Sequence, residues 1–91
     1  MTLQEQDSIF SRLFKERTEF KRERAAVDAE LQTYSENFST LSAQLVHDRH
    51  AALGTLRELD AARCFNLVKE WNDLCSKIAD HTKHIVEMGG E

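Results

Sequence analysis

The segment ALGTLRE at residues 52–58 decides how the chain can fold, because it carries the signals for the end of one helix and the start of another. Gly54 can adopt the left-handed conformation that ends many helices. Thr55 and Glu58 then form a capping box, in which a hydroxyl and a carboxylate three residues apart satisfy free backbone N–H groups. The sequence therefore predicts a turn near Gly54, between a helix over residues 3–53 and a second over residues 56–88.

An apolar seam with alternating steps of three and four residues runs through both predicted helices, and its phase changes at the turn. We expect the two seams to face each other, which predicts one all-α domain over residues 1–91, an antiparallel, coiled-coil-like helical hairpin. A turn at residue 54 would pair Arg24 with Ile85. The same register builds the core from Leu31 with Ile78, Tyr34 with Leu74, Phe38 with Trp71, and Leu41 with Leu67. Tyr34 and Trp71 each carry a polar tip that must reach a partner or the edge of the core.

The composition favours helices and excludes several other classes. There is no proline and there are three glycines, whereas a β-rich domain needs many turns built from these residues. Hydrophobic residues make up 41% of the chain and charged residues 31%, with a net charge of −4, which argues against disorder. Neither a membrane-spanning run nor a signal peptide is recognisable, and two cysteines do not form a disulfide framework. We expect a cytoplasmic protein.

The second predicted helix is apolar over more than one face. Beside its seam it carries a further set of small or apolar side chains, namely Phe65, Val68, Cys75, Ala79 and Val86. One facing helix cannot cover so wide a stripe. Dimerisation into a four-helix bundle would cover it, and a third helix folded back from within the chain is the alternative.

An apolar cluster near the N-terminus is the predicted partner-binding site. The longer first helix would overhang the second before about residue 16, and the overhang carries Ile9, Phe10, Leu13 and Phe14. Exposing these side chains is costly, so they would insert into a groove of a partner protein. Alternatively, they cover the wide stripe of this chain or of its twin.

A basic segment follows this cluster and is a second candidate surface. Its exposed cations, Arg12, Lys15, Lys21 and Arg22, could bind nucleic acid or anionic lipid. Acidic residues are interleaved with them and would repel phosphate, so a solvated face with local ion pairs is the simpler interpretation, and nucleic acid is not the expected partner. The acidic remainder of the chain also allows an inhibitor of a basic cleft.

The sequence contains no recognisable catalytic, cofactor or metal site. The histidine pairs His47/His50 and His81/His84 each offer two ligands on one helix face, and two ligands do not make a metal site. A nucleotide-binding loop and a nucleophile beside a base are both missing, so we expect no enzyme and no cofactor.

The sequence is best interpreted as a small helical protein–protein interaction module, an adaptor, scaffold subunit or escort. Its expected partners are a second copy, giving a homodimer, and a heterologous helical protein. No motif is diagnostic of a known family.

Overall fold

Three helices account for nearly all of residues 3–90, the part of the chain that the computed structural model describes. They are α1 (Leu3–His47), α2 (Arg49–Glu58) and α3 (Ala61–Glu87), and these described residues contain no strand. The predicted all-α class is therefore confirmed.

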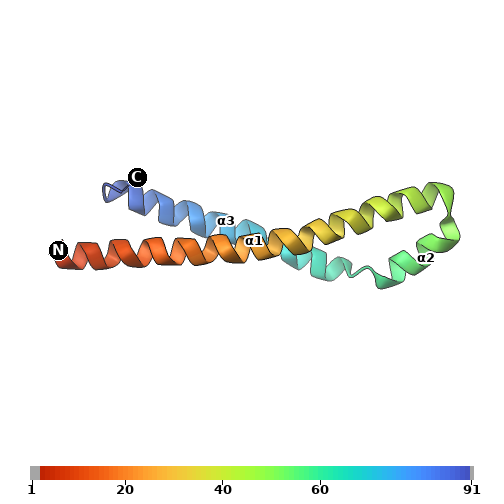
Figure 1. The fold of residues 1–91 in the computed structure, drawn as a ribbon, viewed down its shortest axis with the longest axis horizontal. Coiled ribbons are helices and arrows are strands. Elements are labelled where there is room, and N and C mark those ends of the chain that lie inside the picture. The colour runs from red at the N-terminus through yellow and green to blue at the C-terminus, as the bar shows by residue number, and fades with distance from the viewer. Residues whose placement is uncertain (1–2, 91) are drawn as a thin grey trace.

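The molecule is a rod about two helices thick. Its principal dimensions are 67 × 18 × 14 Å. At about 1.5 Å per residue, the 45 residues of α1 span this whole length. α3 lies antiparallel beside the N-terminal part of α1, α2 lies beside its C-terminal part, and the two chain ends meet at one end of the rod (Figure 1).

The predicted turn near Gly54 is wrong, as are the helix boundaries that depend on it. The chain reverses at Asp48, whose carboxylate accepts a hydrogen bond from the backbone N–H of Ala51 at 3.1 Å and caps α2. Asp60 caps α3 in the same way through the N–H of Arg63 at 2.9 Å. Gly54 lies inside α2 with helical geometry. A glycine within a helix costs only about 1 kcal/mol, whereas each aspartate satisfies N–H groups that would otherwise be free.

The register between α1 and α3 differs from the predicted one by about three helical turns. Arg24 lies against Cys75, with Nη1 and Sγ 3.6 Å apart, and not against Ile85 ten residues further on. Arg17 likewise donates a hydrogen bond to the Thr82 hydroxyl at 3.2 Å. The shift follows from the reversal at Asp48, because an earlier reversal brings earlier residues of the second arm against each residue of α1. The predicted core layers are therefore replaced.

The core is concentrated between α1 and α3. Val27, Leu67 and Leu74 are buried at its centre, packed against partly buried side chains, Phe20, Leu31, Tyr34 and Trp71. Of the eight predicted core residues, Leu41, Leu67, Leu74 and Ile78 are buried, Leu31, Tyr34 and Trp71 are half-buried, and Phe38 is 43% exposed. Phe38 remains exposed because the shifted register moves it beyond the strongest part of the α1–α3 contact.

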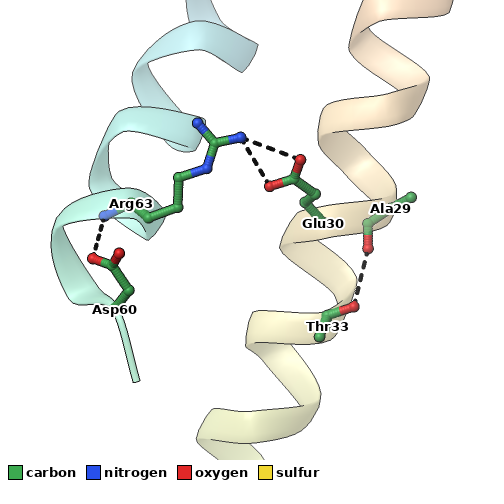
Figure 2. Close-up of polar contacts among 5 residues, drawn as sticks. All are labelled: Ala29, Glu30, Thr33, Asp60 and Arg63. Carbon is green, nitrogen blue, oxygen red and sulfur yellow. Dashed lines mark hydrogen bonds and ion pairs between the residues drawn. The ribbon is translucent and has the colours of Figure 1, made fainter. Parts of the chain in front are cut away.

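An ion pair joins α1 to the start of α3 (Figure 2). One guanidinium nitrogen of Arg63 lies 3.2 and 3.1 Å from the two carboxylate oxygens of Glu30, while the backbone N–H of Arg63 donates to Asp60. Both side chains of the ion pair are about half exposed, so it contributes less than about 1 kcal/mol. It lies where α3 begins alongside α1.

Candidate interaction surface

α3 carries a second apolar stripe that the rest of the chain does not cover. We define the outer stripe as Phe65, Val68, Cys75, Ala79 and Val86. Phe65, Val68 and Val86 are 64%, 44% and 51% exposed, Ala79 is exposed, and Cys75 is half-buried. The outer stripe is the set of residues that the sequence predicts to be too wide for one facing helix.

The outer stripe is distinct from the stripe that faces α1. The inner stripe of Leu67, Leu74, Ile78 and Ile85 is at most 8% exposed. With about 100° of rotation per residue, the centre of the outer stripe lies about 110° around α3 from the centre of the inner one. α3 therefore has two apolar faces at nearly a right angle to each other, and α1 covers only one of them.

Two arginines of α1 line the boundary between α1 and the outer stripe. Arg17 is 7% exposed, and its guanidinium lies 4.9 Å from the centre of the Phe14 ring while it donates to Thr82. Arg24 donates to the thiol of Cys75 one heptad further along. In the sequence these arginines only interrupt the apolar seam. Their spacing of seven residues puts both on the same side of α1, and this pattern could have predicted that they line the edge of the α1–α3 contact.

The apolar N-terminal cluster packs against the end of α3 and forms no overhang. Leu13 is buried, and Ile9, Phe10 and Phe14 are half-buried. The Phe10 ring packs so tightly against Gly90 that a side chain at Gly90 would overlap it. The shifted register explains this, because it brings the end of α3 and Gly90 against the part of α1 that carries the cluster. The predicted docking role of these four residues remains a prediction.

Further exposed apolar side chains lie around the reversal of the chain. Their side chains are between 43% and 69% exposed, and they are Phe38, Leu45, Val46, Leu53 and Leu56. They come from two helices, with Phe38, Leu45 and Val46 on α1 and Leu53 and Leu56 on α2. Leu53 and Leu56 lie one turn apart on α2, whereas Val46 precedes the reversal.

The four predicted anion-binding residues do not form one surface. Arg12 lies 3.7 Å from the Glu16 carboxylate. Lys15 and Arg22 line a shallow hollow that also includes Glu19. Nine residues separate Arg12 from Lys21, which places them on opposite sides of α1 at about 180°. Arg12, Lys15 and Arg22 lie within about 80° of one another around α1, Lys21 alone lies on the other side, and carboxylates accompany the cations.

His81 belongs to a polar contact between α1 and α3. Its Nε2 lies 2.7 Å from a carboxylate oxygen of Glu16, and its Nδ1 lies 3.0 Å from the carbonyl oxygen of Lys77. The His81 hydrogen bond lowers the pKa of Glu16 from its usual value, and the nearby charge of Arg12 adds to this, although desolvation opposes it. The Phe20 ring packs edge-on against the imidazole at 5.2 Å between centres. The contact is thus a structural link between the two helices.

Within residues 3–90, no three histidine, cysteine or acidic side chains are grouped closely enough to hold a metal ion. No helix in that range has the length and apolar character needed to cross a membrane. The indole N–H of Trp71 is buried and has no hydrogen-bond partner among the described residues.

Comparisons of the chain with protein-family models, with curated proteins and with solved structures give no match. The proposal below therefore depends on the surfaces of this chain alone.

Proposed function

We propose that this chain is a small helical protein–protein interaction module, an adaptor, scaffold subunit or escort, and that it binds another helix along the outer stripe of α3. The exposure of Phe65, Val68 and Val86 supports the proposal most directly. Burying a large apolar side chain completely is worth roughly 1.5–3 kcal/mol, and covering these half-exposed ones would return about half of that each. A helix packed there would supply this free energy as binding energy.

The angle between the two stripes of α3 supports a bundle as the bound form. In a four-helix bundle each helix contacts two neighbours in directions roughly at right angles. α3 has this pattern, with the inner stripe on α1 and the outer stripe about 110° away. A helix on the outer stripe would make α3 a corner of such a bundle.

The N-terminal cluster is assigned to packing within the chain in this proposal. Leu13 is buried, and a side chain at Gly90 would overlap both the Phe10 ring and Ile85. Ile9, Phe10 and Phe14 are already half-buried, so a partner would gain less by covering them than by covering the more exposed Phe65 and Val86.

Affinity capture from the native source tests the proposed function. The double variant Phe65→Glu/Val86→Glu places two charges on the outer stripe and should lose its bound partner proteins. The matched control is Val46→Glu, which charges an apolar side chain of α1 that is 69% exposed and lies outside the stripe. This control should retain the partners, and far-ultraviolet circular dichroism should show equal helix content in all three proteins. Equal recovery with the double variant and the control would reject the proposed surface.

A further inference from the structure

We propose that the helix covering the outer stripe belongs to a second copy of this chain, with α3 packed along α3 and the two Cys75 side chains facing each other at the centre. This inference rests on the proposed function and names its partner. It adds a symmetric interface and one residue that identifies its centre.

The exposed area of the chain is large enough for such an interface. A compact protein of 10.5 kDa is expected to expose about 5,400 Å², whereas this chain exposes 6736 Å². The excess of about 1,300 Å² exceeds the roughly 800 Å² that each partner buries in a standard stable interface. The radius of gyration agrees, at 20.0 Å against about 12 Å for a compact chain of this length. A second two-helix rod placed alongside would remove the excess.

The outer stripe has the layout that a two-fold axis requires. In a two-fold interface the same patch of both subunits makes the contact. The stripe extends from Phe65 to Val86, about 32 Å along the helix, and Cys75 lies at its midpoint. Parallel and antiparallel pairing of the two stripes both place Cys75 against its own copy.

The surroundings of Cys75 fit this central position. Its thiol is free and half-buried, and it accepts a hydrogen bond from Arg24 on the α1 side. Its nearest stripe neighbours along the helix are Val68 and Ala79, one or two turns away. A small side chain at this point allows two α3 helices to approach closely, as small residues do at other helix contacts.

Sedimentation velocity and thiol crosslinking test the inference on the full chain. The variant Cys64→Ser keeps Cys75 as its single cysteine. It should sediment as a dimer, and a short bismaleimide should join two chains through their Cys75 thiols. In the matched control, Cys64→Ser/Cys75→Ser/Asp73→Cys, the single thiol lies about 130° around α3 from the stripe. Sedimentation gives the dimer fraction of each variant, and per dimer we expect the control to crosslink at least tenfold less. Adding Phe65→Glu/Val86→Glu to the first variant should give a monomer that does not crosslink.

The outcomes separate this inference from the proposed function. A wild-type monomer at concentrations up to about 0.1 mM, where a micromolar complex is essentially complete, would overturn the second copy as partner. If capture of another protein still depended on Phe65 and Val86, the interaction module would stand. The α3–α3 contact would be overturned if Phe65→Glu/Val86→Glu left dimerisation unchanged. Equal crosslinking through Cys75 and through a cysteine at residue 73 would overturn it as well. Loss of dimerisation in Val46→Glu, with the stripe variant unaffected, would move the interface to the reversal of the chain.

Discussion

The two ends of the rod use similar apolar side chains with different results. At the end where the chain termini lie, the facing helix α3 is 27 residues long, and Leu13, Leu74 and Ile85 are buried. At the reversal, the facing helix α2 has 10 residues, and Leu45, Leu53 and Leu56 remain about half exposed. Leu41 and Ala52 are also buried around the reversal, so the short α2 covers part of this end and the longer α3 covers more of the other. Stability should be concentrated where α3 faces α1.

The largest expected effect compares one leucine from each region. Leu67→Ala removes a side chain that is 1% exposed and should lower the free energy of unfolding by about 2–5 kcal/mol. Leu53→Ala truncates a side chain that is 50% exposed and should cost less than about 1 kcal/mol. Urea unfolding followed by circular dichroism measures both at one protein concentration, because self-association would contribute to stability. Equal losses would mean that the two regions are equally well packed.

The next effect concerns the aspartates that begin α2 and α3. Asp60→Ala removes the acceptor for the Arg63 N–H and should destabilise the chain by about 1 kcal/mol, as loss of an N-cap usually does. Asp48→Ala should cost no more, because the α2 that it caps packs less of the core. Asp60→Asn keeps an acceptor oxygen and serves as the control in the same urea experiment. If Asp60→Ala and Asp60→Asn were both as stable as the wild type, the cap would make no contribution to stability.

Two glycines should respond to alanine with opposite signs. Gly54 lies inside α2 with open space where a Cβ would be, so Gly54→Ala should stabilise the chain by about 0.5–1 kcal/mol. Gly89 has φ +87°, which alanine adopts only with strain, so Gly89→Ala should destabilise it. Thermal unfolding of the two variants gives the sign directly. Destabilisation by Gly54→Ala would contradict a helical Gly54 and would support the turn that the sequence predicts there.

The smallest effect is a pH dependence at the contact between Glu16 and His81. The pKa of Glu16 is lower in the folded chain than the value near 4.5 expected when it is unfolded, mainly because of the hydrogen bond with His81. The stabilisation is therefore present above about pH 4.5 and is lost as the pH falls through the folded pKa. The urea midpoints of wild type and Glu16→Gln should differ at pH 6 and converge as the pH falls below the lowered folded pKa of Glu16. His81→Phe removes the donor, and in that background Glu16→Gln should have no further effect. A constant difference between wild type and Glu16→Gln at all pH values would contradict the linkage.

The fold class could be predicted from the sequence because helical periodicity and the lack of proline are local properties. The position of the reversal could not be predicted, because two segments of the sequence carry helix-capping signals. Gly54, Thr55 and Glu58 resemble a helix end and start, but Asp48 and Asp60 are N-caps that leave Gly54 inside a helix. In the structure the Thr55 hydroxyl donates to the Gln44 side chain at 2.6 Å. Local capping strength cannot be ranked without knowing which tertiary contacts each reversal allows.

The apolar face of α3 was predicted better than the core register, and its role as an interaction surface stays a prediction. The width of the apolar stripe on α3 follows from residue spacing alone, and a register error does not change it because the stripe belongs to one helix. The overhang of Ile9, Phe10 and Leu13 depended on the register and failed with it. A shift of about three turns brought the end of α3 against these residues. Properties of a single helix could thus be predicted from the sequence. Contacts between two helices could not, because they depend on where the chain reverses.

The meeting of both chain ends at one end of the rod has a mechanical consequence. A load applied between the two ends would separate α1 from α3 beginning at the contact of Phe10 with Gly90, and would break the layers one after another as a zipper opens. A load applied between the start of α1 and Asp60 at the start of α3 would pull the two antiparallel helices along their axes in opposite directions and shear many layers together. The same molecule should therefore yield at low force in the first direction and resist in the second.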